Sequence, residues 1–212
     1  MTIHWSLLVP GVLLLLFPAD RLLSSMIDLR SFDGFQSLED SPRYRPWWWV
    51  PALWLDPLRG FLGTWLLRES LALTSVRWEL ASPAPYAAAV AVLAAGVVGQ
   101  ILTRRGDQGV LLAPVGYVAG VAAALTPWPV ALIAVVTGFV GLFAFRQFHA
   151  FFAFGAATVA ILGFVLETEV MWIAPAAGAF ALPNLAGLFT GSALELPTRN
   201  ASRPSPPPRR AA

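Results

Sequence analysis

The placement of charged residues constrains this chain more than any motif does. From residue 84 onward, five apolar runs that contain no charged side chain follow one another, at 84–102, 109–125, 129–145, 150–166 and 170–189. An α-helix needs roughly 17 to 25 apolar residues to cross a bilayer. The pattern therefore predicts five transmembrane helices, and the short connections between them predict that neighbouring helices are antiparallel.

The charges in the connections alternate in sign along this part of the chain. Arg104 and Arg105 follow the first run and Arg146 follows the third, whereas Glu167 and Glu169 follow the fourth. Cytoplasmic loops are enriched in basic residues. We therefore expect the arginine-bearing connections and the arginine-rich tail to be cytoplasmic, and the connections at 126–128 and 167–169 to be external.

The N-terminal 83 residues divide into an anchor and a mixed segment. The run 3–17 is apolar but short and contains Pro10, and its flanks lack the basic start and small-residue cleavage site of a signal peptide. We expect a retained anchor at 1–18, a polar and Trp-rich segment at 19–83, a five-helix bundle at 84–190 and a disordered tail at 191–212. This gives an all-α bundle of about six spans, with both termini cytoplasmic.

Within 19–83, the charged stretch 20–46 predicts an amphipathic surface helix followed by a loop. Trp47, Trp48 and Trp49 then stand in a row, and tryptophan concentrates at the lipid headgroup level. These side chains predict an interfacial position for the segment that follows.

Asp56 and Pro57 are typical of a helix start, because aspartate caps free N–H groups and proline suits the first helical position. We interpret 47–76 as an interfacial or re-entrant helical pair between the first two spans. The alternative is an additional span in which Asp56 and Arg59 pair inside the protein. A charge near mid-bilayer costs at least about 2.5 kcal/mol, which disfavours that alternative.

The composition excludes several kinds of chemistry. The chain is 57% hydrophobic and 12% charged, whereas a soluble domain carries about a quarter charged residues. All fourteen basic residues are arginine and there is no cysteine, so a lysine-dependent phosphate loop, a Schiff base, a thiol nucleophile and a thiolate metal site are excluded. Only His4 and His149 could serve as histidine ligands or bases. We expect no enzyme activity, metal site, cofactor or nucleic-acid partner.

Four polar residues are candidates for a ligand site. Arg146 and His149 are three residues apart within an aromatic stretch, which suggests an anionic headgroup site or an axial ligand for a porphyrin, against an ordinary interfacial polar pair. Gln100 and Asn184 are the polar candidates within the spans, and we expect them to form interhelical hydrogen bonds. Pro183 beside Asn184 could break the last helix as transporters do, or be purely structural.

Small residues recur at every fourth position on two of the predicted helices. In lipid, such residues let helix backbones approach closely, so these stripes predict helix packing, with the wall of a permeation path or a pigment-contact surface as the alternative. The residues are Ala87, Ala91, Ala95 and Gly99, then Gly116, Gly120 and Ala124.

The five clear spans carry no ionisable side chain in their middle, which counts against an ion-coupled carrier. We therefore expect a non-enzymatic scaffold or accessory subunit that contacts the lipid bilayer and other membrane helices or copies of itself. The alternative is a small transporter or channel for a neutral or lipid-like solute, and the least supported is an enzyme acting on lipid headgroups. The excess of Ala, Gly, Pro and Arg, which have GC-rich codons, suggests a bacterial source. We therefore expect the protein to lie in a bacterial inner membrane.

Overall fold

The computed structural model describes residues 3–17, 51–71, 83–103, 111–166, 170–190 and 194–195. These residues form an all-α bundle whose elements, in chain order, are α1 (Trp5–Leu16), α3 (Pro51–Ser70), α4 (Pro83–Thr103), β1 (Leu111–Leu112), α5 (Val115–Leu125), α6 (Trp128–Phe145), α7 (Phe148–Val165), α8 (Val170–Thr190) and β2 (Leu194–Glu195). The strands are two residues long and pair in parallel, Leu111 with Leu194. The predicted surface helix, Trp47 to Trp49 and the tail lie outside the described residues.

Each of the six predicted spans corresponds to an apolar helix. Within the described residues, four helices are long and apolar enough to cross a membrane, namely α4, α6, α7 and α8. The two shorter apolar helices are α1, with 12 residues, and α5, with 11. The sequence prediction of a helical membrane bundle is confirmed, and two of its helices are shorter than a full span.

Residues 51–70 form one continuous helix, α3, instead of the expected helical pair. Pro57 lies inside it, and Asp56 is not its N-cap, because the helix already begins at Pro51. Proline is well tolerated in the first turn of a helix, so Pro51 provides the start that the sequence suggested at Pro57. Asp56 and Arg59 pair within the protein, as in the alternative, but α3 is not among the helices long and apolar enough to cross a membrane.

The span expected at 109–125 begins later, at Val115. Its N-cap is Pro114, and the residue before a proline is biased away from helical backbone angles. Ala113 therefore stays outside the helix, and the two residues before it, Leu111 and Leu112, form β1. As a result α5 has only 11 residues, about 16 Å at 1.5 Å per residue.

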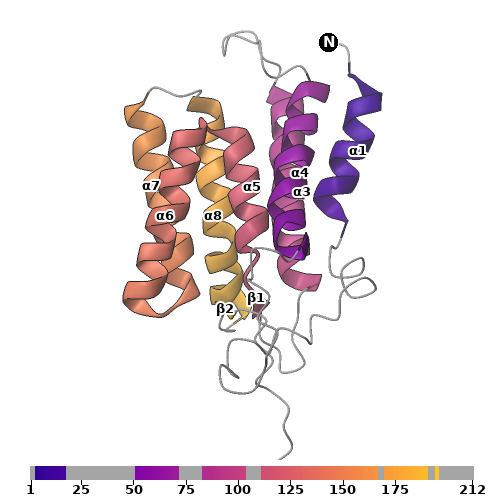
Figure 1. The fold of residues 1–212 in the computed structure, drawn as a ribbon. Coiled ribbons are helices and arrows are strands. Elements are labelled where there is room, and N and C mark those ends of the chain that lie inside the picture. Colours follow the sequence, from indigo (N-terminus) through magenta and orange to yellow (C-terminus); the bar gives the residue numbers. More distant parts are fainter. Residues whose placement is uncertain are drawn as a thin grey trace, which may run out of the picture.

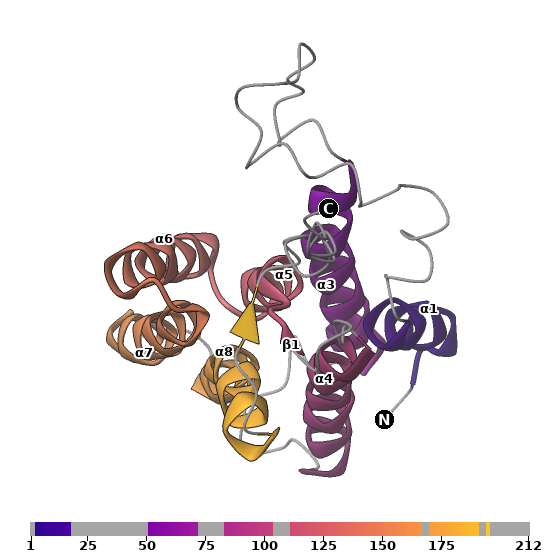
Figure 2. The same cartoon turned by 90° about the horizontal axis from the view of Figure 1, so that it is seen from below.

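The helices stand side by side and alternate in direction (Figure 1). Viewed along their axes, α6 and α7 form a pair at one edge, α5 lies near the centre, and α1 lies at the opposite edge (Figure 2). Helix α3 also runs from one end of the bundle to the other. With it, the described residues form seven helices, so α1 begins at one end of the bundle and α8 ends at the opposite end (Figure 1). The backbone N–H of His4 donates to the carbonyl of Ser70 over 2.9 Å, which ties the start of α1 to the end of α3.

Helix α3 packs most closely against α5, through glycines on both helices. A Cβ atom added at Gly120 would lie 2.0 Å from the carbonyl oxygen of Pro57, and one added at Gly60 would lie 2.5 Å from the carbonyl oxygen of Tyr117. Only the absence of a side chain permits this backbone approach. The core of the bundle continues through Tyr117 to Phe151 and Trp172, which are fully buried.

Candidate functional site

Arg59 is the centre of a buried polar cluster on α3. It is 6% exposed, and its Nη2 atom lies 3.2 Å from Oδ1 of Asp56 and 2.8 Å from Oε1 of Gln100 on α4. Its Nη1 atom donates to the carbonyl of Phe17, the residue that ends α1. A guanidinium has five N–H donors in a fixed planar arrangement, which allows one side chain to join three helices.

Two further side chains bind the same end of α1. Nε2 of Gln100 donates to the carbonyl of Phe17 over 3.2 Å, and the hydroxyl of Tyr117 donates to the carbonyl of Leu15 over 3.0 Å. The guanidinium of Arg59 lies 5.1 Å from the ring centroid of Tyr117, within cation–π range. The last carbonyls of a helix have no partner within the helix and carry partial negative charge. The cluster therefore caps the short α1.

Arg68 makes an equivalent contact at the other end of α3. Its Nη1 atom donates to the carbonyl of Ala124 over 2.6 Å, in the last turn of α5. Its guanidinium carbon lies 5.1 Å from the ring of Trp172 on α8, and that ring meets Tyr86 edge to face at 5.7 Å. Arg68 therefore joins α3, α5 and α8.

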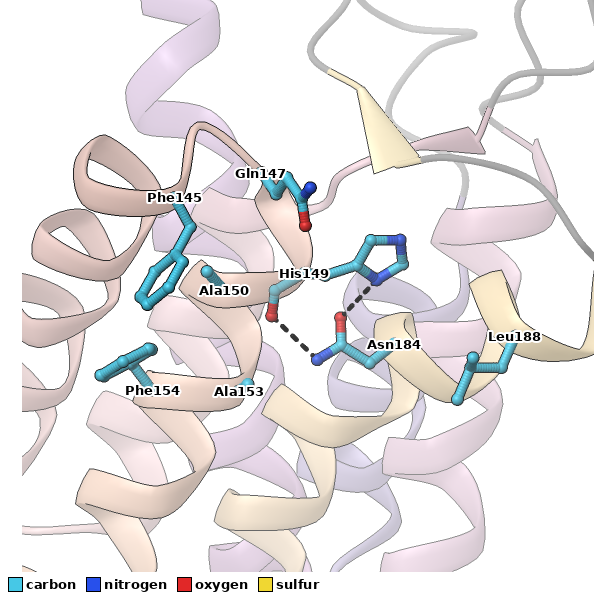
Figure 3. Close-up of a pocket in the computed structure, with 8 residues that line it drawn as sticks. All are labelled: Phe145, Gln147, His149, Ala150, Ala153, Phe154, Asn184 and Leu188. Carbon is cyan, nitrogen blue, oxygen red and sulfur yellow. Dashed lines mark hydrogen bonds between the residues drawn. The ribbon is translucent and has the colours of Figure 1, made fainter.

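A groove lies between α7 and α8, at the end of the bundle that carries Arg146. It is open to the side and has a volume of about 450 Å³, within the range of roughly 300 to 1,000 Å³ that is usual for small-molecule sites. Figure 3 shows Phe145 and Phe154 on one side of the polar side chains and Leu188 on the other. The lining residues are Phe145, Gln147, His149, Ala150, Ala153, Phe154, Asn184 and Leu188.

His149 and Asn184 form a reciprocal pair in this groove. The amide Nδ2 of Asn184 donates to the backbone carbonyl of His149 over 3.0 Å, and Oδ1 of Asn184 lies 3.0 Å from Nδ1 of His149. A carbonyl only accepts, so the first bond fixes the amide orientation, and Oδ1 can then only accept a hydrogen bond. Nδ1 of His149 therefore carries a proton, and Nε2 points away from Asn184 (Figure 3).

The structure separates the four predicted ligand candidates into two places. His149 and Asn184 are paired, whereas Gln100 belongs to the Arg59 cluster. Arg146 does not share a helix with His149, because it ends α6 in a left-handed conformation with a φ of 55°, and such a residue stops a helix. Arg146 is exposed and stands in the turn between Phe145 and Gln147, which both line the groove.

The two small-residue stripes differ in their surroundings. Gly116 and Gly120 face α3, where Pro57 lies against both. Ala91 and Ala95 are exposed, and a Cβ atom added at Gly99 would meet nothing within 4 Å. The stripe on α5 thus packs within the chain, and the stripe on α4 faces outward.

Pro183 does not break α8, which continues through both of its prolines. Asn184, the next residue, forms an interhelical hydrogen bond, as does Gln100, in agreement with the sequence expectation. Arg68 and Tyr117 were not identified as candidates from the sequence. One sequence signal could have pointed to Arg68. It is a charged residue among apolar ones near the end of a helix, and such a residue usually has a polar partner inside the protein.

These features define the chain as a multi-pass helical protein that is embedded in a membrane, in which two arginines of α3 bind the ends of other helices. Comparisons with protein-family models, with curated proteins and with solved structures gave no match for this chain. Among the residues that the structure describes, no group of three or more His, Cys, Asp or Glu side chains could hold a metal ion.

Proposed function

We propose that this protein is a non-enzymatic scaffold or accessory subunit that binds a transmembrane helix of another membrane component along α4. The observation that carries the proposal is the outward direction of the α4 stripe, which is formed by Ala87, Ala91, Ala95 and Gly99. The opposite side of α4 faces the bundle through Ala89, Leu93 and Val97, which are buried.

A stripe of small residues has a specific use in lipid. Lipid chains are as apolar as leucine, so helices in a membrane associate through close backbone packing instead of hydrophobic expulsion from water. On an outward face, such residues contribute nothing to the internal packing of this chain. Their arrangement supports an intermolecular helix contact.

The polar side chains of the spans favour a scaffold over the transporter alternative. Gln100 and Asn184 were the candidates for a solute site, but they lie in separate clusters and both bond to groups of their own chain. Arg59 and Arg68 bind helix ends in the same way. The polar groups thus hold helices together, and the groove beside Asn184 opens at the edge of the bundle.

The direction of the helices and the basic connections support one orientation in the bacterial inner membrane that we propose. The connection between α6 and α7, which contains Arg146, lies at the lower end in Figure 1. Helix α4 ends at the same end, and Arg104 and Arg105 follow it in the sequence. Basic connections favour the cytoplasm. If α3 crosses with the others, the start of α1 is external and the end of α8 is cytoplasmic, which revises the expectation that both termini are cytoplasmic.

Photo-cross-linking tests the α4 interface directly, because the natural chain has no cysteine and a single introduced cysteine can carry a benzophenone label. Ala91→Cys and Ala95→Cys should each give a cross-linked species in native membranes, whereas Ala89→Cys, which is buried against the bundle, should give none. A product of twice the monomer mass would identify the partner as a second copy.

A substitution that fills the stripe complements this experiment. The double variant Ala91→Leu, Ala95→Leu should dissociate the assembly seen on native gels in mild detergent, because leucine side chains hold the backbones apart. Ala144→Leu is the matched control, an exposed alanine on α6, and should leave the assembly intact. An assembly that survives the double leucine variant would contradict the proposal.

A further inference from the structure

The groove between α7 and α8 is lined by both apolar and polar side chains. Phe145 and Phe154 lie on one side of the pair formed by His149 and Asn184, and Leu188 lies on the other side (Figure 3). None of the eight lining side chains is acidic. Such a groove matches a molecule with an apolar chain and a polar or negatively charged end.

The apolar lining at Leu188 is continuous with the exposed apolar surface of the bundle. Leu188 is 75% exposed and the neighbouring Phe189 is 88% exposed, so the groove opens toward the hydrocarbon side of the helices. Contiguous exposed apolar surface of this kind belongs in contact with lipid or another membrane helix. A ligand that enters from this side comes from the bilayer.

The polar end of the groove lies where helices begin and end. Arg146 is exposed in the turn beside the groove, and its guanidinium places a positive charge where α6 ends and α7 begins. Asn184 holds the ring of His149 through Nδ1, so that Nε2 of a neutral His149 accepts a hydrogen bond. A negative charge near Arg146 and a hydroxyl donor near His149 would both be satisfied.

We propose that this groove binds an anionic phospholipid with a hydroxyl-bearing headgroup, such as phosphatidylglycerol. One acyl chain lies against Phe145 and Phe154, the phosphate lies near Arg146, and a headgroup hydroxyl donates to Nε2 of His149. The site is separate from the α4 stripe, so that failure of the lipid site and failure of the α4 interface are distinguishable.

Photo-labelling in nanodiscs tests this proposal with the full-length protein. Photoactivatable phosphatidylglycerol and phosphatidylcholine are compared at equal mole fraction, and labelled peptides are identified by mass spectrometry. We expect labelling at residues 145–154 with a preference for phosphatidylglycerol of about fivefold, which corresponds to roughly 1 kcal/mol. Equal labelling by both lipids at these residues would overturn the assignment.

Three variants separate the parts of the site. Ala153→Trp fills the groove and should abolish the labelling, whereas Ala144→Trp, at an exposed alanine that does not line the groove, should leave it unchanged. Arg146→Asn removes the charge and keeps a residue that adopts the left-handed conformation readily. It should reduce the lipid preference by about threefold, the size of one exposed charge contact.

A second groove-filling variant and a competition experiment complete the test. Leu188→Trp also fills the groove, from an exposed position, and should abolish labelling too. It replaces Ala153→Trp in the test if that variant does not fold. Free glycerol phosphate should not compete with the labelled lipid, because it lacks the acyl chain. Effective competition by glycerol phosphate, or unchanged labelling in a folded groove-filling variant, would overturn the proposal.

Discussion

The Nη1 atom of Arg68 lies 2.6 Å from the carbonyl oxygen of Ala124, in the last turn of α5. Arg59, on the same helix, binds the carbonyl of Phe17 at the end of α1. The two arginines are separated by about 13 Å along α3 at 1.5 Å per residue. They therefore reach the ends of the two shortest apolar helices, which finish at different heights in the bundle.

This relationship explains how a helix with four charged side chains can lie inside an apolar bundle. A short helix that ends within a low-dielectric environment leaves carbonyl groups without water or backbone partners. A guanidinium supplies several donors and a positive charge, which is favourable at a helix C-terminus. The charges of α3 and the short lengths of α1 and α5 thus compensate one another.

Replacement of Arg68 should destabilise the junction of α3, α5 and α8. Arg68→Met keeps much of the side-chain length but removes the donor to Ala124 and the cation over Trp172. A hydrogen bond from a charged group is worth about 1.5 to 3 kcal/mol, and we expect a loss of that size in detergent unfolding experiments. Leu132→Met is the control at an exposed position on α6, and its effect should stay below about 0.5 kcal/mol. Equal effects of the two substitutions would contradict the capping role.

Arg59 and Gln100 should show strong energetic coupling. Arg59 forms an ion pair with Asp56, and removal of one partner of a buried ion pair costs about 3 to 5 kcal/mol because the other charge remains buried. Arg59→Met should therefore be severely destabilising, and Gln100→Leu should cost about 1 to 3 kcal/mol. The double variant should lose clearly less than the two single losses combined. Additive losses in this double-mutant cycle would show that the 2.8 Å contact carries no energy.

The sequence predicts the helices well and their mutual orientation poorly. The uncharged runs locate α4, α6, α7 and α8 to within a few residues, because lipid requires continuous apolar helices. The partners of Arg59 and Arg68 are backbone carbonyls 42 and 56 residues away, and a carbonyl has no sequence signature. The outward face of α4 was equally hidden, because Ala and Val occupy both of its sides. The pair of His149 and Asn184 spans 35 residues and depends on the same unknown orientation.

Gly120 and Gly99 should respond in opposite ways to alanine. A methyl group at Gly120 would lie 2.0 Å from the carbonyl oxygen of Pro57, so Gly120→Ala must separate α3 from α5, and overpacking of this kind costs about 1 to 3 kcal/mol or more. At Gly99 a methyl group meets open space, and alanine is favoured over glycine in a helix by about 0.8 to 1 kcal/mol. Thermal unfolding of dissociated protein in detergent should therefore place Gly120→Ala below the natural protein and Gly99→Ala at or above it. Loss of stability in Gly99→Ala would show that its surroundings are as crowded as those of Gly120.

Cysteine labelling should show whether α3 crosses the membrane with its neighbours. His4, Pro127 and Gln147 are exposed and are the N-caps of α1, α6 and α7. Helices α1 and α6 begin at one end of the bundle and α7 begins at the other (Figure 1). In spheroplasts of a bacterial host, a membrane-impermeant maleimide should label His4→Cys and Pro127→Cys, and should label Gln147→Cys only after lysis. The reason is that α3 adds a seventh upright helix within the described residues, so the start of α1 is opposite to the arginine-bearing turn. If His4→Cys instead requires lysis, as Gln147→Cys does, then α3 does not cross the membrane and the six-span arrangement holds. The hydrogen bond from Arg59 to the end of α1 would then lie at the membrane surface.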